Sequence, residues 1–361
     1  MKQTLSTTAA WHRKPLAFLL VTLLCLGTFS CSPDYEWDDL DDFLDDINKA
    51  EAIPANIVFH EPGLYPEGVG HDALHQRFLV SSAAEGTIGA VSYAGNYTPF
   101  ITDDRLIGTA GIQVDEERKR VLVAGADPGA AATSTPETAG KLAQLGIFDL
   151  ETGKAIHVVE LSALRPGMPH FANDVAVDAL GNAYVTDSYS PIIYKVDVGG
   201  NATVFYENEA FATAPGAFGF NGIEYHPDGF LLVAFSSANE VYKIPVDNTA
   251  GITKVELDAA LVAPDGLLLS KDGKQLVVVN NAGGQPAGKV VSFKSTDNWA
   301  SGSEDESFST GAVFPTTATG YGDAVFVLYA HLNVLFGDAA SPQAEYTIKK
   351  IPFKNNQALK N

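Results

Sequence analysis

The sequence predicts an all-β fold. The chain has 361 residues, of which 33 are Gly and 19 are Pro, and its Val, Thr, Tyr and Phe residues gather in short runs. Runs of this kind, separated by Gly, Asp and Asn, are typical of β-strands joined by tight turns. The clearest example is HFANDVAVDALGNAYVTDS, residues 170–188, in which two apolar runs flank the turn ALGN. This arrangement predicts a β-hairpin.

The hairpin pattern occurs six times along the chain. Each copy has a polar or small residue, a short apolar strand, an Asp- or Gly-containing turn and a longer apolar strand, at intervals of 43 to 63 residues. By this register, the first strands of the six copies begin at Glu67, Ala110, Asn173, Asn221, Asp265 and Thr316 or Thr317. Four-stranded repeats of this length predict a six-bladed β-propeller with antiparallel blades.

The third repeat shows one whole blade, and the ends of the chain fit a closed ring. We expect the strands of that blade at Asp174–Asp178, Ala183–Asp187, Ile192–Val196 and Thr203–Tyr206. The last repeat has no sequence for a fourth strand after Tyr346–Pro352, and Asn56–His60 could supply it from the N-terminal side. Such closure removes the exposed edges of an open sheet. We therefore expect one propeller over residues 53–361.

The longest interval between repeats contains an insertion, Gly125 to Gln144, between the second and third strands of the second blade. The insertion is rich in Ala, Thr, Gly and Pro, and we expect it on the face where the six first strands begin. Two interpretations follow from its length and composition: a lid over the mouth of the ring, or an excursion without fixed structure.

Residues 1–30 have the features of an export signal. Lys2, Arg13 and Lys14 precede a short apolar run, Ala17–Leu26, and the sequence GTFSCS then ends at Cys31 and Ser32. This resembles a bacterial lipoprotein cleavage box, in which Cys31 becomes the lipidated first residue. An ordinary signal peptide or an uncleaved anchor is the alternative. We expect an exported envelope lipoprotein on the periplasmic or cell-surface side of the outer membrane, or alternatively a secreted protein.

Residues 31–52 form an acidic segment before the first repeat, with nine Asp and Glu residues between Asp34 and Glu51. Its apolar residues recur at helical spacing, so an amphipathic helix is one interpretation and a solvated tether is the other. The two Cys residues of the chain, Cys25 and Cys31, both precede the propeller. The propeller is therefore expected to fold without a disulfide.

The charge of the chain argues against nucleic acid as a partner. There are 44 Asp and Glu residues against 23 Lys and Arg, which gives a net charge of −21. Binding to phosphate backbones needs a basic surface, which this composition does not provide. We expect contact with a membrane through a lipid anchor alone, and the sequence gives no indication of an oligomeric state.

The residues that begin the first strands suggest a metal site. Innermost strands line the channel of a propeller, so their first residues should converge at one end of its axis. Four of the six bear carboxylate or amide oxygens: Glu67, Asn173, Asn221 and Asp265. This donor set suits Ca²⁺ best among divalent cations, with Mg²⁺, Mn²⁺ and Zn²⁺ as alternatives. Each of these residues alone could instead cap a turn.

Two further residues lie beside Asn173. Asp174 is expected to stand behind the ligands and hold one of them or a neighbouring loop. His170 precedes Asn173 by three residues. It is a candidate general base near the mouth of the channel, or else a residue that forms a hydrogen bond where its strand begins.

Several of these motifs carry a family resemblance. PEG, ANDVAVDALGNAYVTD, FNGIEYHPDG and PDGLLLSKDGKQLVVVNN resemble segments of the regucalcin-like senescence-marker/gluconolactonase family, and more distantly of paraoxonases and strictosidine synthase-like propellers. The resemblance extends from Tyr65 to Asn281. It implies a divalent metal on the axis, held by Glu67, Asn173, Asn221 and Asp265, and hydrolysis of a lactone or ester with Asp265 as a candidate general base.

The resemblance has clear departures. After its Glu, the family has a GP.W pattern where this chain has GVGHD, residues 68–72, and we find no pair of Arg residues suited to a sugar acid. The substrate is therefore left open. Asp265 cannot be both a tight ligand and a strong base without compromise. The predicted function is a metal-dependent hydrolase, and the alternative is a non-enzymatic, envelope-anchored propeller that binds a ligand or protein through its top face.

Overall fold

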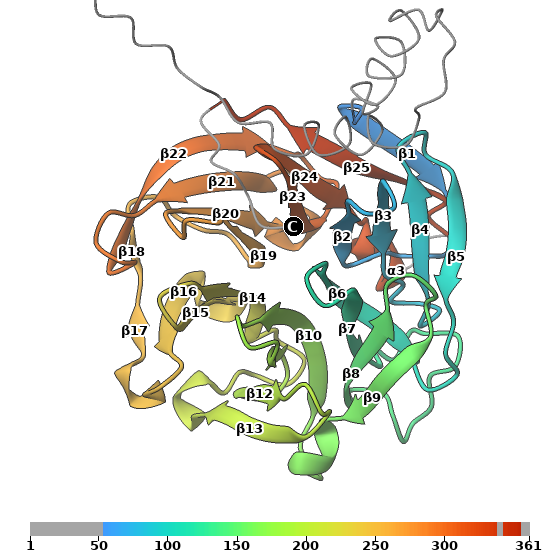
Figure 1. Cartoon of the computed structure of the whole chain (residues 1–361), viewed down its shortest axis with the longest axis horizontal. Helices are drawn as coiled ribbons and strands as arrows, with labels where there is room; N and C mark the ends of the chain where they lie inside the picture. The colour runs from blue at the N-terminus through green and yellow to red at the C-terminus, as the bar shows by residue number, and fades with distance from the viewer. Residues whose placement is uncertain (1–52, 338–341, 355–361) are drawn as a thin grey trace, which may run out of the picture. The chain divides into compact units, whose positions relative to one another are not determined.

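The computed structural model of the chain describes residues 53–337 and 342–354. The predicted signal peptide, Cys31 and the acidic tether therefore lie outside the described residues. Residues 53–361 cluster as one compact unit, whose described part consists of strands arranged in blades around an axis (Figure 1). In these two ranges, no helix has the length and apolar character needed to cross a membrane. The predicted all-β propeller is confirmed.

The strands of blades 1 to 3 follow the chain from the axis outward. Blade 1 contains β2 (Val69–Asp72), β3 (Arg77–Val80), β4 (Ile88–Ser92) and β5 (Tyr97–Ile101). Blade 2 contains β6 (Gly108–Asp115), β7 (Arg120–Ala126), β8 (Lys141–Asp149) and β9 (Ala155–Glu160). Blade 3 contains β10 (His170–Val177), β11 (Ala183–Asp187), β12 (Ile192–Val196) and β13 (Ala202–Glu207). The prediction for blade 3 differs mainly in the earlier start of β10.

Blades 4 to 6 repeat this order. Blade 4 contains β14 (Phe220–His226), β15 (Phe230–Phe235), β16 (Glu240–Pro245) and β17 (Thr253–Lys254). Blade 5 contains β19 (Pro264–Leu269), β20 (Gln275–Asn280), β21 (Lys289–Lys294) and β22 (Ser301–Ser309), and β18 (Glu256–Leu257) pairs in parallel with β22. Blade 6 contains β23 (Pro315–Tyr321), β24 (Ala324–Tyr329), β25 (Glu345–Ile351) and β1 (Asn56–His60).

The ring is closed by the predicted N-terminal strand. β1 pairs antiparallel with β25 over five residue pairs, from Asn56 opposite Lys349 to His60 opposite Glu345. The outer strand of blade 6 thus comes from the other end of the propeller sequence, and β25 keeps no unpaired edge on that side. The predicted closure is confirmed.

Short helices occupy some of the loops. The described residues contain the α-helix α3 (Leu332–Leu335) and the 3-10 helices η1 (Ser162–Leu164), η2 (Glu209–Phe211), η3 (Ser236–Ala238), η4 (Thr249–Gly251) and η5 (Ala282–Gly284). Of these, η3, η5 and α3 each follow the second strand of a blade.

Apolar side chains fill the spaces between neighbouring blades. One cluster, for example, joins blades 3 and 4 through Tyr184, Ile193, Phe220 and Leu231, all of which are buried. Five further clusters of this kind occur in the described residues. Because both faces of each blade are packed in this way, the strands are apolar on both sides, which explains the continuous apolar runs of the sequence.

Blades 2 and 3 are joined by backbone as well as by side chains. The first residues of β8 pair in parallel with the first residues of β10, with His170 opposite Lys141 and Phe171 opposite Leu142. The two blades consequently form one continuous eight-stranded sheet, whereas the other blades are separate sheets.

The insertion in blade 2 is a folded loop. β7 continues to Ala126 and β8 starts at Lys141, so the connection is shorter than the predicted insertion. The buried carboxylate of Asp127 accepts hydrogen bonds from the Gly129 amide (2.7 Å), the Ser134 hydroxyl (2.8 Å) and the Thr138 hydroxyl (2.7 Å). The loop is thus fixed by its own hydrogen bonds at the rim of the channel, and the alternative of an unstructured excursion is wrong.

Candidate active site

Five of the six residues predicted to begin a first strand lie at an irregularity of their blade, whereas Glu67 lies two residues before β2. In β10, the register shifts between Ala172 and Val175, so Asn173 and Asp174 together oppose the single residue Thr186 of β11. Similar shifts frame Ala110, Asn221, Asp265 and Thr316 in β6, β14, β19 and β23. Two residues opposite one is the definition of a β-bulge, a device that redirects side chains. These positions are therefore bulges and not turns.

Hydroxyl groups at the end of β3 and on β11 satisfy backbone amides at the predicted positions of blades 1 and 3. In blade 1, the Ser81 hydroxyl accepts hydrogen bonds from the amides of Glu67 (3.0 Å) and Gly68 (2.7 Å). In blade 3, the Thr186 hydroxyl accepts one from the Asp174 amide (3.1 Å). Both hydroxyls are buried, and without them these amides would lose their partners at a cost of about 1–3 kcal/mol each.

Glycine directly follows Glu67 and Asn221, at points where the first strands of neighbouring blades come into close contact. A Cβ atom on Gly222 would lie 2.3 Å from the carbonyl oxygen of Asp265 in the next blade. A Cβ atom on Gly68 would lie 2.3 Å from the carbonyl oxygen of Ala110. Only glycine allows the backbones to approach this closely. The Glu-Gly, Asn-Gly and Asp-Gly pairs of the sequence thus serve the tight ring around the axis.

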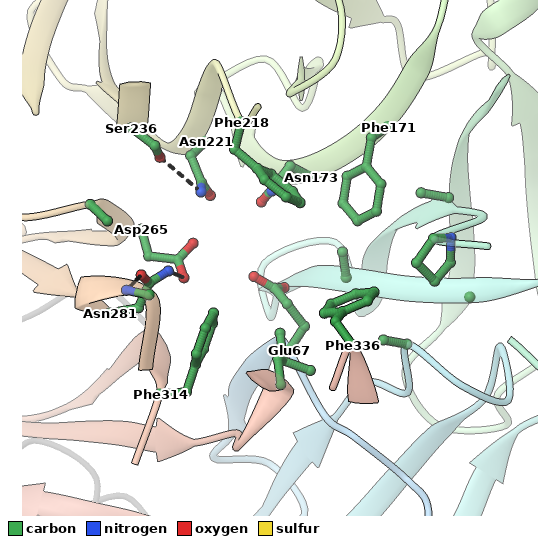
Figure 2. A pocket seen from close by; sticks show the side chains of 18 of the residues that line it. Glu67, Phe171, Asn173, Phe218, Asn221, Ser236, Asp265, Asn281, Phe314 and Phe336 are labelled. Atoms are coloured by element: carbon green, nitrogen blue, oxygen red, sulfur yellow. Dashed lines mark hydrogen bonds between the residues drawn. The ribbon is translucent and has the colours of Figure 1, made fainter. Parts of the chain in front are cut away.

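The four predicted ligands line one cavity of about 340 Å³ at one end of the axis. Figure 2 shows the carboxylates of Glu67 and Asp265 and the amides of Asn173 and Asn221 pointing into the same space. All four residues are buried. Four blades contribute one each, as the repeat register predicts. Ala110 also lines the cavity, whereas the hydroxyls of Thr316 and Thr317 donate to the carbonyl oxygen of Glu67 (2.6 and 2.9 Å).

The two carboxylates of the cavity are electrostatically strained. Burial, followed by the charges of Asp265 and Asp174, raises the pKa of Glu67 well above its usual range. Burial raises the pKa of Asp265 to about 7, although hydrogen bonds from Asn281 and Asn221 act in the opposite direction. Two buried carboxylates that face each other resist simultaneous ionisation. The cavity floor therefore favours a proton or a cation.

Two oxygen atoms at the cavity floor have no hydrogen-bond partner. Oε2 of Glu67 and Oδ1 of Asn173 are both buried and unpaired. Unpaired buried polar atoms are uncommon in folded proteins, and each calls for a partner that the chain itself does not provide. Because both atoms are acceptors, the missing partner must be a donor or a cation.

The donor set fits the predicted cation. It consists of oxygen atoms alone, it carries two carboxylates, and two of its oxygens are the unpaired atoms of Glu67 and Asn173. Hard divalent cations such as Ca²⁺ are bound by such sets. In the part of the chain that the structure describes, the cavity included, no group of three or more His, Cys, Asp or Glu side chains is placed to hold a metal, so binding here would depend on the two Asn oxygens as well.

Asp265 is held by two amide side chains. Nδ2 of Asn281 donates to Oδ2 of Asp265 at 2.7 Å, and Asn221 also forms a hydrogen bond with the carboxylate. Nδ2 of Asn221 lies 3.1 Å from the hydroxyl of Ser236, which in turn donates to the Pro264 carbonyl at 2.6 Å. Asn281 and Ser236 lie in the loops after β20 and β15, and their roles as partners of site residues were not predicted.

Asp174 contacts the backbone of the neighbouring blade. Its carboxylate accepts hydrogen bonds from the amide of Val175 (2.9 Å) and from the amide of Ile223 (3.2 Å), which follows the bulge of blade 4. Burial raises the pKa of Asp174 to about 7, against these two hydrogen bonds. Asp174 thus links the bulges that carry Asn173 and Asn221.

His170 does not reach the cavity with the other four residues. Its Nδ1 lies 2.7 Å from the Asp187 carboxylate and its Nε2 lies 2.9 Å from the Arg165 carbonyl oxygen. Burial opposes protonation of the ring, but the hydrogen bond and charge of Asp187 outweigh it and raise the pKa of His170. Both ring nitrogens are occupied, so the structure supports a role at the start of the strand and we assign His170 no part in a reaction.

Comparison of the sequence with known proteins finds no matching protein family and no matching curated protein. Comparison of the structure does find similar folds. The major allergen Mala s 1 of Malassezia sympodialis has a TM-score of 0.66 and 17% identity, over 83% of this chain and 96% of that chain. A luciferin-regenerating enzyme has a TM-score of 0.56 and 13% identity, over 84% and 99% of the two chains.

A third similar structure is a gluconolactonase from Xanthomonas campestris, with a TM-score of 0.54 and 14% identity, over 82% of this chain and 89% of that chain. The propeller fold is shared. At these identities the comparisons establish the fold and leave the chemistry open. The predicted resemblance to gluconolactonase-type propellers is thus confirmed for the architecture, and two of the three similar proteins are named as enzymes.

Proposed function

We propose that the protein is a divalent-metal-dependent hydrolase that acts on a lactone or related ester in the cavity at the end of the propeller axis. The observation that carries this proposal is the convergence of four oxygen-bearing side chains from four blades, two of which present buried, unpaired oxygens to the cavity. A protein that used the propeller only as a scaffold would gain nothing from this costly arrangement.

Glu67, Asn173, Asn221 and Asp265 would hold the cation, for which Ca²⁺ is the first candidate. When bound, the cation supplies positive charge that polarises an ester carbonyl and offsets the charge of the two carboxylates. The bulges of blades 3, 4 and 5 and the Ser81 hydrogen bonds at Glu67 and Gly68 hold the backbone of the four residues before any ligand arrives, and this reduces the cost of ordering the site.

Asp265 is the best candidate for the general base. In the metal-free cavity burial raises its pKa to about 7. A bound cation lowers this pKa, so Asp265 acts as a base only if it binds the cation loosely and Glu67, Asn173 and Asn221 are the main ligands. In this step, Asp265 takes a proton from water while the water oxygen forms a bond to the carbonyl carbon. The ester C–O bond then breaks, and the proton passes to the departing alkoxide. Asn281 and Asn221 keep the carboxylate in a fixed orientation during both transfers.

The test combines metal analysis with a substrate panel. Lactones and aryl esters are assayed with and without a chelator, for the unchanged protein and for Glu67→Gln, Asp265→Asn and Glu117→Gln. The side chain of Glu117 is 81% exposed and serves as the matched control. We expect hydrolysis that the chelator abolishes, and loss of bound metal and activity in the first two variants alone. Unchanged metal content in the Glu67→Gln, Asp265→Asn double variant would refute the ligand assignment.

The alternative function gives a different result in the same test. A non-enzymatic propeller that binds a ligand or protein through its top face would hydrolyse no member of the panel, with or without added cation. We place the protein at the bacterial envelope, anchored through Cys31, as part of the same proposal, because the composition of residues 1–31 supports it.

A further inference from the structure

We infer that the cavity takes a neutral ligand with an apolar body, an aryl ester or an acyl-substituted lactone, and discriminates against polyhydroxylated sugar lactones. The inference deepens the proposed function, because it assumes that the reacting group lies at Glu67 and Asp265. It starts from four phenylalanine side chains that line the cavity: Phe171, Phe218, Phe314 and Phe336. Figure 2 shows them around the polar floor.

Two of these rings form a rigid wall. Phe171 and Phe218 meet edge to face with their centroids 5.3 Å apart. Tyr189 packs against both, at 5.3 Å from Phe171 and 5.4 Å from Phe218. Aromatic groups arranged in this way present a preformed apolar surface to a ligand.

The third and fourth rings come from blade 6. Phe314 directly precedes β23, and Phe336 directly follows α3, whose residue Leu332 is buried and also lines the cavity. Phe336 is 55% exposed, although a residue of this type normally avoids water. An exposed ring at the edge of an apolar cavity gains contact area when a ligand enters.

The hydroxyl groups of the wall are already used. The Ser236 hydroxyl donates to the Pro264 carbonyl (2.6 Å), and the Ser237 hydroxyl donates to the Phe218 carbonyl (2.6 Å). The Thr109 hydroxyl donates a hydrogen bond to the Thr87 carbonyl oxygen (2.9 Å) and accepts one from the Ser82 amide (2.8 Å). A polyol would therefore lose its hydrogen bonds to water without replacement along this wall, which disfavours its binding.

In the described residues, the wall of the cavity also offers no positive side chain to an anionic group on the body of the ligand. Among the described residues that line it there is no Lys, Arg or His, and both ionisable side chains, Glu67 and Asp265, are acidic. A carboxylate or phosphate on the ligand body would meet no opposite charge in the wall. The ligand class that remains is neutral and apolar, with one polar group that reaches the floor.

The experiment measures binding separately from hydrolysis. The purified protein is titrated with the neutral fluorophore N-phenyl-1-naphthylamine in the presence of Ca²⁺, and undecano-δ-lactone or glucono-δ-lactone is added as competitor. We expect the fluorophore to bind and undecano-δ-lactone to displace it at a concentration at least tenfold lower than glucono-δ-lactone does.

Phe336→Ala should weaken fluorophore binding about fivefold, which corresponds to about 1 kcal/mol. The matched control is Leu180→Ala, at a position that is 78% exposed in the turn between β10 and β11 and does not line the cavity. This control should leave binding unchanged. Glu67→Gln should retain fluorophore binding even where hydrolysis is lost, because the apolar wall is intact.

The two proposals fail differently. If the fluorophore binds and is displaced as expected but no ester of the panel is hydrolysed, the hydrolase proposal fails and the ligand class stands. If sugar lactones are hydrolysed and displace the fluorophore as well as undecano-δ-lactone does, the hydrolase stands and the ligand class is refuted. Absence of fluorophore binding, or equal binding by Phe336→Ala and Leu180→Ala, would also refute it.

Discussion

His71 should make the fold sensitive to mild acid. This side chain is fully buried in β2, with its Nε2 2.8 Å from the Tyr93 hydroxyl and its Nδ1 without a partner. The rings of Phe78 and Tyr321 lie at 5.0 and 4.6 Å from the imidazole. Burial lowers the pKa of His71 to about 4, against the charge of Asp72, which acts in the opposite direction.

Protonation of His71 favours the unfolded chain, because the pKa of this residue is lower in the folded chain than in the unfolded one. The folded-state pKa, about 4, lies below the ordinary value of 6.5, so above pH 6.5 the imidazole is neutral in both states and contributes nothing. Between these values the unfolded chain binds a proton that the folded chain does not. The free energy of unfolding therefore decreases as the pH is lowered. His71 alone makes it about 2 kcal/mol smaller at pH 5 than at pH 8.

The assay is denaturant unfolding at pH 8 and pH 5 for the unchanged protein and for His71→Gln. The buried carboxylates Glu67, Asp174 and Asp265 have raised pKa values and act with the opposite sign, so the difference between the two proteins isolates His71. We expect the unchanged protein to lose about 2 kcal/mol more than the variant does. His60→Gln, at an exposed position of β1, controls for the loss of an imidazole as such. Equal losses in the unchanged protein and His71→Gln would refute the reasoning.

Three further predictions test the bulges, the rim loop and the anchor. Gly222→Ala should lower the free energy of unfolding by about 1–3 kcal/mol in denaturant titrations, because its Cβ would meet the Asp265 carbonyl at 2.3 Å, whereas the exposed Gly199→Ala should not. Asp127→Ala should release the loop of residues 127–140, so that a glutamate-specific protease cuts after Glu137; resistance equal to that of the unchanged protein would contradict the role of this carboxylate. Cys31→Ser should abolish incorporation of labelled palmitate in a bacterial host, and labelling that persists would show that Cys31 is not the lipidated residue.

The fold could be predicted because each blade repeats one pattern of strands and turns. The limits of β11 and β12 agree residue for residue with the prediction. The turn ALGN directly precedes β11, and the turn DVGGN directly follows β12. The bulges could not be distinguished from turns. Asn-Gly and Asp-Gly pairs are common in both, and the distinction depends on the backbone of the next blade, which lies 2.3 Å from the missing Cβ of Gly222.

The site could be predicted in part for the same reason. Repeat register brought Glu67, Asn173, Asn221 and Asp265 together, but it gave no information on side-chain direction. Successive side chains of a strand point to opposite faces. At the start of β10 this rule sends Phe171 into the cavity and His170 toward Asp187. Asn281 was missed as a partner of Asp265 because it lies in a loop, where spacing along the chain does not determine which atoms meet.

The parallel pairing of β8 with β10 bears on how the ring can move. Blades 2 and 3 share ladder pairing at Lys141 and His170. The backbone amide of Thr109 also donates to the Ser82 carbonyl between blades 2 and 1 (2.9 Å), and that of Gly219 to the Ser188 carbonyl between blades 4 and 3 (2.8 Å). Thermal breathing of the ring should therefore be concentrated at the other boundaries. The wall that carries Phe171 would stay still while the side with Phe314 and Phe336 yields, so ligands should enter and leave past blade 6.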